Sequence, residues 1–122
     1  MQAIKALVVF FYLILLSAWP GVVWGHTLPV HSEPGVGTTI NSSPAFVRIW
    51  FDSSLEPDFS TIRVHNVGGE QVDKRNGHVS SSDASLLEVS LPTLPPGTYL
   101  VIWSVVTCDG HPTEGDYTFT IK

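Results

Sequence analysis

Apolar and polar residues alternate with a period of two along most of this chain, and this pattern constrains the fold more than any other feature. In AFVRIWF (45–51), Val47, Ile49 and Phe51 fall on one face of an extended segment, with Arg48 on the other. Such alternation over a short run is typical of a half-buried β-strand. Further strands are predicted in STIRVHNV (60–67), LLEVSL (86–91), TYLVIWSVVT (98–107) and DYTFTIK (116–122).

Residues that form turns separate these segments. Outside residues 1–25, Pro or Gly interrupts every stretch that could place apolar residues at helical spacing. DSSLEPDFS (52–60) could hold one turn of helix or a loop that crosses between sheets. The sequence therefore predicts an all-β fold, a single β-sandwich of about seven short strands. The separating turns are EPGVG, NSSP, VGGE, RNGH, LPPG and CDGHP.

Residues 1–25 have the three parts of a secretory signal peptide. Lys5 precedes the apolar stretch ALVVFFYLILLSAW, and the small residue Gly25 closes the segment, with Val23 two positions before it. The apolar stretch of 14 residues is shorter than the roughly 20 residues that a membrane-spanning helix needs. We therefore expect a cleaved signal peptide without a permanent membrane anchor, export of the protein, and a mature chain of residues 26–122 that starts at His26.

Composition limits the partners of the mature chain. The leader contributes one of the six basic residues and none of the eleven acidic ones, so the mature chain has a net charge of −6 with histidines neutral. Such a chain is poorly suited to nucleic acid or an anionic membrane surface, and a cationic ligand suits it better. Cys108 is the single cysteine, which excludes an intrachain disulfide and a Cys-rich zinc site, so the fold must depend on its hydrophobic core.

The five histidines are the most informative residues for function: His26, His31, His65, His78 and His111. As an N-terminal residue, His26 would offer an α-amine and an imidazole Nδ1 that can chelate one metal ion, although a histidine at a chain end can also be merely mobile. In CDGHP, one glycine separates Asp109 from His111, so a carboxylate and an imidazole could converge on one point. The same motif could equally be a turn with two solvent-exposed polar residues.

Two longer segments carry a resemblance to a known family. They are HSEPGVGTTINSSPAFVRIWF and LPTLPPGTYLVIWSVVTCDGHPTEGDYTFTI, and the order of Pro-Gly-Thr-Tyr, a tryptophan strand, Asp-Gly-His-Pro and an aromatic closing strand is the most specific part. Together with the chain length, they resemble the CopC family of periplasmic copper-resistance proteins over essentially all of the mature chain. The resemblance implies an immunoglobulin-like, Greek-key β-sandwich that binds one Cu(II) ion per chain.

The ligands implied by the resemblance are the amine and imidazole of His26, the Asp109 carboxylate and the His111 imidazole. Three nitrogens and one oxygen suit the tetragonal preference of Cu(II). The implied function is that of a monomeric, non-enzymatic Cu(II) carrier or buffer in periplasmic copper homeostasis and resistance, with an inner-membrane copper-handling protein as a possible recipient. Two alternatives stay open: a small oxidative enzyme built on a histidine brace, such as a copper monooxygenase, and a metal-free β-sandwich that serves as an interaction module.

The sequence departs from some family members in its soft ligands. The only methionine is Met1, which leaves with the leader, so we expect no methionine-rich Cu(I) site. Cys108 could bind or reduce copper, but strand alternation sets it apart from Asp109 and a buried, inert thiol is the preferred interpretation.

The remaining histidines and the aromatic residues are interpreted as structural. His31, His65 and His78 are expected on the surface, with His31 as a possible accessory ligand, whereas Trp50, Trp103, Tyr117 and Phe119 are expected to pack in the core.

Overall fold

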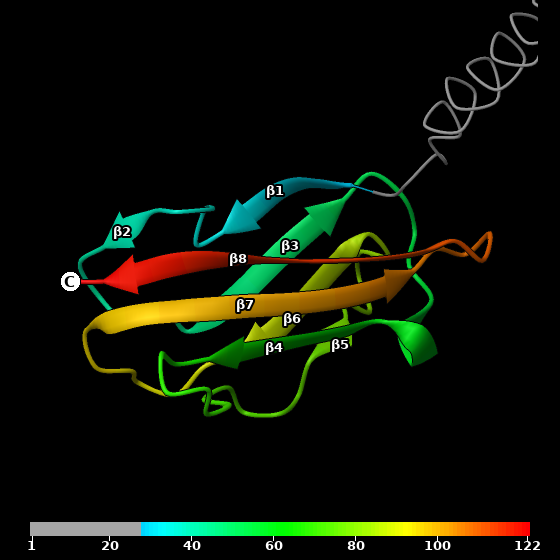
Figure 1. Ribbon diagram of the computed structural model, residues 1–122. Helices are drawn as coiled ribbons and strands as arrows, with labels where there is room; N and C mark the ends of the chain where they lie inside the picture. The colour runs from blue at the N-terminus through cyan, green and yellow to red at the C-terminus, as the bar shows by residue number, and fades with distance from the viewer. Residues whose placement is uncertain (1–27) are drawn as a thin grey trace, which may run out of the picture.

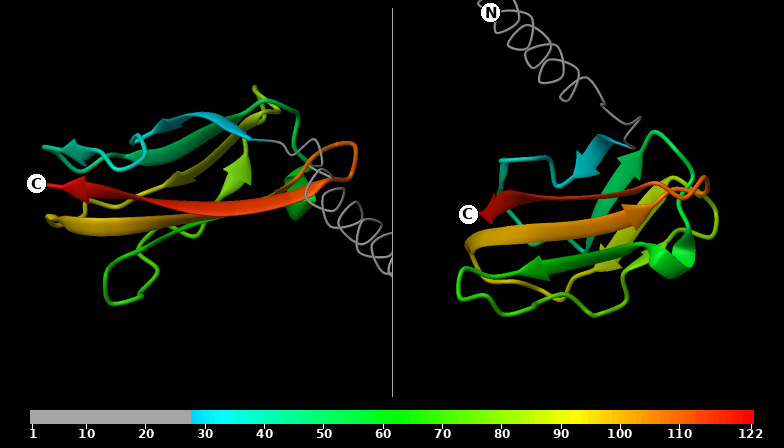
Figure 2. Two further views of the ribbon diagram at one scale, coloured as in Figure 1. Left: turned by 45° about the horizontal axis from the view of Figure 1, so that its top comes forward. Right: turned by 45° about the vertical axis from the view of Figure 1, so that its right-hand side comes forward.

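The computed structural model describes residues 28–122, so the predicted signal peptide and His26 lie outside the described residues. Two four-stranded sheets pack face to face, in the orders β1-β3-β6-β5 and β2-β8-β7-β4 (Figures 1 and 2). The predicted all-β sandwich is confirmed. The elements are β1 (Pro29–Glu33), β2 (Thr39–Ile40), β3 (Phe46–Phe51), η1 (Pro57–Phe59), β4 (Thr61–His65), β5 (His78–Val79), β6 (Leu86–Ser90), β7 (Gly97–Val106) and β8 (Pro112–Ile121).

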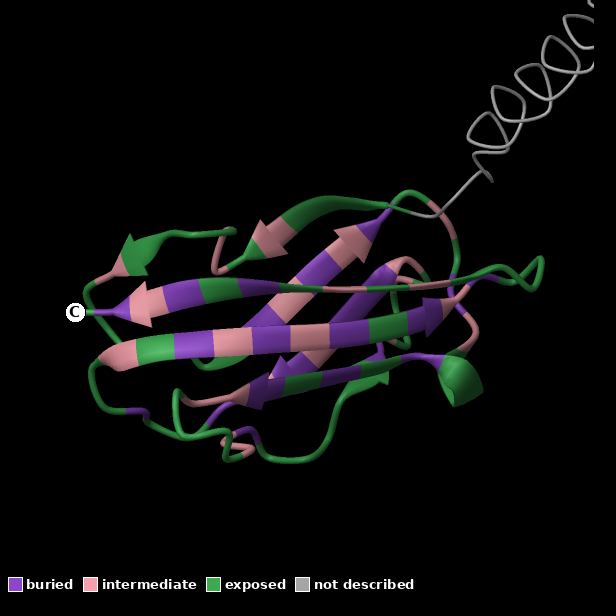
Figure 3. Ribbon diagram, viewed as in Figure 1, coloured by how far each residue is buried: buried purple, intermediate pink, exposed green. Residues whose placement is uncertain are grey.

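The core lies between the two sheets and is supplied by alternate residues of the long strands (Figure 3). In β3 the predicted inner face is confirmed, because Val47, Ile49 and Phe51 are buried. Phe119 of β8 is fully buried at the centre, where its ring stacks on Tyr99 of β7 with the ring centroids 5.6 Å apart. In these long strands, alternation therefore turns one face toward the core and the other toward solvent.

The structure has eight strands where the sequence predicts about seven, and the strands without a sequence signal lie at sheet edges. β2 and β5 have two residues each, too few to show a period. Four of the five residues of β1 are exposed, so its residues do not alternate between buried and exposed. The segment 52–60 contains the three-residue 3-10 helix η1, which settles the choice between a helical turn and a plain loop. Within residues 28–122, no helix has the length and apolar character needed to cross a membrane.

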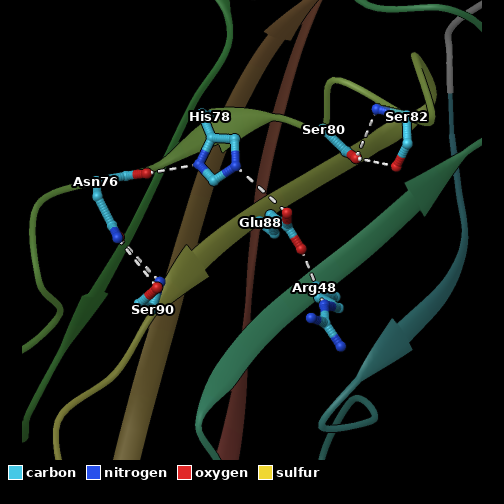
Figure 4. Close-up of polar contacts among 7 residues, drawn as sticks. All are labelled: Arg48, Asn76, His78, Ser80, Ser82, Glu88 and Ser90. Atoms are coloured by element: carbon cyan, nitrogen blue, oxygen red, sulfur yellow. Dashed lines mark hydrogen bonds and ion pairs between the residues drawn. The ribbon is translucent and has the colours of Figure 1, made fainter.

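A polar network crosses the outer face of the sheet that contains β3, β5 and β6 (Figure 4). The Glu88 carboxylate accepts a hydrogen bond from Nε of Arg48 at 2.9 Å, and its other oxygen lies 3.3 Å from Nε2 of His78. Nδ1 of His78 lies 2.7 Å from the carbonyl oxygen of Asn76, which can only accept, so Nδ1 carries the proton of this bond. The network thus ties the short edge strand β5 to the middle of its sheet.

Replacement of Glu88 by Ala is expected to lower the free energy of unfolding by about 1 kcal/mol, because Arg48 and His78 both lose their charged partner. The matched control is Glu70→Ala, a substitution of an exposed loop carboxylate with no ion pair in the described part of the chain. Urea unfolding of the two variants measures the difference. Equal stability of the two variants would show that the network contributes nothing.

Candidate metal centre

The turn between β7 and β8 holds the predicted pair Asp109 and His111. β7 and β8 pair along their full lengths, from Gly97 opposite Ile121 to Val106 opposite Pro112, so the hairpin carries the turn at one end of the sandwich. Gly110 has φ of +89°, a left-handed conformation that glycine adopts without steric cost. Its N–H donates to the Thr107 carbonyl oxygen at 2.8 Å, which closes the turn.

Thr107 holds this turn in place through hydrogen bonds. Thr107 is 3% exposed, and its hydroxyl donates a hydrogen bond to Oδ1 of Asp109. The same hydroxyl oxygen accepts a hydrogen bond from the backbone N–H of His111 at 3.1 Å. A third bond joins the Thr107 N–H to the His111 carbonyl oxygen at 3.0 Å. Both predicted ligand residues are therefore fixed to one buried side chain.

The Asp109 carboxylate and the His111 imidazole face each other at the surface. Oδ2 of Asp109 lies 3.3 Å from Nδ1 of His111, and the two side chains are 71% and 59% exposed. The Thr107 hydroxyl, and to a lesser degree His111, hold the pKa of the Asp109 carboxyl below its usual range, so this carboxyl is ionised at neutral pH. Two donors that each lie about 2.0–2.2 Å from one metal ion are separated by roughly 3 Å. The observed spacing fits two ligands of one ion, and the exposure of both side chains also fits the alternative of a turn with two solvent-exposed polar residues.

The start of β1 lies at the same end of the sandwich as this turn. The backbone N–H of Leu28 donates to Oδ1 of Asp52, and the N–H of Asp52 donates to the Leu28 carbonyl oxygen, both at 3.2 Å. Two residues further on, Ser54 accepts a hydrogen bond from the N–H of Cys108 at 3.1 Å. Segment 52–54 thus links the first described residue to the β7–β8 turn, and Figure 1 shows the start of β1, the end of β3 and this turn at one end of the fold.

Among residues 28–122, no three His, Cys, Asp or Glu side chains group closely enough to hold a metal ion. The described structure therefore brings together two of the three predicted site residues, and His26 remains a prediction. Two protein donors leave two of the four positions around a four-coordinate ion unfilled. A four-coordinate centre in this turn therefore needs two further donors, which the prediction assigns to His26.

The other histidines lie away from the turn. His31 is exposed on β1, where Nε2 is 3.1 Å from Oε1 of Glu33 and its ring centroid is 5.2 Å from that of Trp50. His78 belongs to the polar network of β5 and not to a turn, and His65 is half-buried with Nε2 lacking a hydrogen-bond partner among the residues described. Surface positions are thus confirmed for His31 and His78 and only in part for His65.

The expectation that Cys108 is buried is wrong. Cys108 is exposed. Strand alternation does group it with Leu100, Ile102 and Val106, but this is the outward face of β7, and the odd-numbered residues such as Val105 point into the core. The apolar character of the outward face caused the error.

The predicted aromatic core is confirmed with one exception. Trp103, Tyr117 and Phe119 are buried. Trp50 is half-buried on the outer face of β3, as its place opposite Val47 and Ile49 requires.

Comparison with known proteins places the chain in a family. The model of the CopC domain matches residues 29–122, which is nearly all of the described structure. The chain belongs to the CopC family. The copper resistance protein C of Escherichia coli is 47% identical over 115 aligned positions that cover 84% of this chain and 91% of that protein. The copper transport protein CutJ of Bacillus subtilis is 33% identical over 89% of this chain, but this chain spans only 20% of that longer protein.

Solved structures agree with this assignment. CopC from Methylosinus trichosporium OB3b is 29% identical, with a TM-score of 0.70 over 80% of this chain and 94% of that one. PcoC, a methionine-rich copper resistance protein from Escherichia coli, is 27% identical, with a TM-score of 0.67 over 80% of this chain and all of that one. These relatives are named as copper-resistance and copper-transport proteins, which supports a copper-handling role for the family, and none of these names denotes an enzyme.

Proposed function

We propose that this chain is a periplasmic Cu(II) carrier or buffer that holds one ion tightly at a centre made of His26, Asp109 and His111. The observation that carries the proposal is the Asp109–His111 pair, with donors 3.3 Å apart, at the end of the sandwich where β1 begins. The N-terminal amine and imidazole of His26 would supply the remaining two donors. Cleavage of a signal peptide after Gly25 is part of this proposal, because it creates the amine.

The position of Leu28 supports the contribution of His26. One residue of extended chain spans about 3.3–3.6 Å, so His26 can reach roughly 7 Å from Leu28. Leu28 is tied to Asp52, and the turn is tied to Ser54, two residues further on. Asp52 and Ser54 are also two residues apart. The distance between them is therefore of the same order as the distance that the chain can span from Leu28 to His26.

The donor types favour Cu(II) over Cu(I). Imidazole, amine and carboxylate are harder ligands than thioether and thiolate, and three nitrogens with one oxygen match the tetragonal geometry of Cu(II). Met1 is the only methionine, so the chain lacks the thioethers that a methionine-rich Cu(I) site requires. This sets the chain apart from its relative PcoC, which is described as methionine rich.

Delivery to an inner-membrane copper-handling protein is the proposed use of the bound ion. CutJ is named as a copper transport protein, and about one fifth of its length is similar to this chain. A domain of this kind thus occurs as part of a longer transport protein, which supports transfer of copper to a membrane partner. We propose that the carrier acts as a monomer.

Substitution of a turn ligand tests the proposal. His111→Asn and Asp109→Asn are each expected to weaken Cu(II) binding by more than about 100-fold, since loss of a ligand costs more than the 10–100-fold typical of a lost outer-shell partner. His31→Asn and His78→Asn are the matched controls and should bind as the unaltered protein does. Competition against a chelator of known affinity gives the dissociation constants.

The outcomes separate the candidate functions. Copper binding that survives both turn substitutions would contradict the proposed centre. No copper uptake by the unaltered processed protein would favour an interaction module. Hydrogen peroxide production by the copper-loaded protein with a reductant would favour an oxidative enzyme.

A further inference from the structure

We infer that Thr107 is a positioning residue that orients Asp109 and His111 before the metal ion arrives. The inference rests on the proposed function, because it assigns Thr107 a role toward the ligands proposed above. Thr107 precedes the CDGHP motif and is not one of the two ligand residues predicted from it. The inference comes from the structure, which places the Thr107 hydroxyl between the two ligand residues.

The hydroxyl of Thr107 joins the side chain of one ligand to the backbone of the other. It donates its single hydrogen to Oδ1 of Asp109, and it accepts the N–H of His111 at 3.1 Å. A hydroxyl has one hydrogen to donate and lone pairs to accept, so this side chain uses both capacities on the turn. With Thr107 only 3% exposed, water has little access to compete for either bond.

These bonds assign different roles to the two oxygens of the carboxylate. Oδ1 is held by Thr107, and Oδ2 is left to face Nδ1 of His111 at 3.3 Å. We expect Asp109 to bind the ion through Oδ2 alone, with Oδ1 kept on the hydroxyl. Without that bond the carboxylate could rotate or offer both oxygens, and the metal would then lose a defined oxygen ligand.

Burial explains why Thr107, and not the ligands themselves, sets the geometry. The side chains of Asp109 and His111 are 71% and 59% exposed, so solvent surrounds most of each. Thr107 is β-branched and therefore restricted at χ1, and its backbone pairs with Leu55 in an isolated bridge. A rigid, buried anchor lowers the conformational entropy that the exposed ligands lose on binding, which is the physical content of preorganisation.

The decisive comparison is between Thr107→Val and Thr107→Ser in the processed full-length chain. Valine keeps the shape and lacks the hydroxyl, whereas serine keeps the hydroxyl and lacks the methyl. Thr107→Val is expected to weaken Cu(II) binding by about 10–100-fold and to change the copper electron paramagnetic resonance spectrum, and Thr107→Ser should stay within about threefold. Thr107→Ala, a smaller variant without the hydroxyl, should behave as Thr107→Val does and covers the case in which valine disturbs the fold.

A double-mutant cycle separates positioning from a merely structural role. If the hydroxyl acts through Asp109, adding Thr107→Val to Asp109→Asn should produce little further loss of affinity. Three results would each overturn the inference. The losses of affinity in the cycle could be additive, or Thr107→Val and Thr107→Ser could lose the same affinity for Cu(II). The third is that both variants without the hydroxyl keep the affinity and the spectrum of the unaltered protein.

The same measurements distinguish this inference from the proposed function. If Asp109→Asn and His111→Asn bind copper normally, the proposed centre is wrong and Thr107 has no ligands to position. If those two lose copper while Thr107→Val does not, the centre stands and only the role of Thr107 is refuted.

Discussion

Addition of one residue before His26 is expected to weaken Cu(II) binding by more than about 100-fold. The added residue converts the α-amine of His26 into a peptide nitrogen, which has no basic lone pair to donate, so the chelate of amine and imidazole is lost. Two of the four proposed donors depend on that chelate. The loss should therefore exceed the 10–100-fold cost of removing an outer-shell partner.

The same residue added after Lys122 is the matched control, because it changes length and mass without touching the N-terminus. Isothermal titration at constant pH, with a competing chelator, measures both proteins. The account expects the C-terminal addition to bind as the unaltered chain does. Equal affinity of the two extended proteins would show that the amine is not a ligand of the metal.

Phe119→Ala is expected to destabilise the fold by about 3–5 kcal/mol. Phe119 is fully buried between the sheets and stacks on Tyr99, so its removal leaves a large cavity as well as lost apolar contact. A domain of this size is typically stable by only about 5–15 kcal/mol, and a single cysteine gives this one no intrachain disulfide to compensate. A large part of its stability would be lost.

Val67→Ala is the control for this prediction, since Val67 is 87% exposed. Its effect should stay within about 0.5 kcal/mol, as for most surface substitutions. Urea unfolding followed by tryptophan fluorescence measures both variants. A loss below about 1 kcal/mol for Phe119→Ala would contradict the placement of this ring at the centre of the core.

The long strands were predictable because each buries one face. The period of two in β3, β4 and β7 follows directly from a sandwich with solvent on one side of each sheet. Three of the four edge strands, β1, β2 and β5, were not predictable, whereas the edge strand β4 buries Ile62 and Val64 and was predicted. β1 is mostly exposed, and β2 and β5 are two residues long, so no core contact imposes a pattern on their sequences.

The proximity of Asp109 and His111 was predictable from the sequence, whereas the residue that supports this pair was not. CDGHP shows a carboxylate and an imidazole around a glycine, and the structure confirms that Asp109 and His111 face each other. Thr107 was missed, although strand parity offered a signal: it shares its face with the buried residues Trp103 and Val105. A hydroxyl on a buried face needs hydrogen-bond partners, and the nearest polar groups are those of the turn.

The error at Cys108 has a related cause. Leu100, Ile102 and Val106 are apolar and yet lie on the outward face of β7. Both faces of this strand are therefore apolar over much of its length, and alternation by itself does not say which face is inside. The tryptophan and tyrosine on the odd-numbered face identify it as the buried one, because the largest side chains fill the space between the sheets.

Native mass spectrometry of the protein recovered from the periplasm tests the central claim most directly, because one spectrum reports both the first residue and the bound metal. The account predicts a species with the mass of residues 26–122 plus one copper ion. A copper-bound species that starts at any other residue would contradict it.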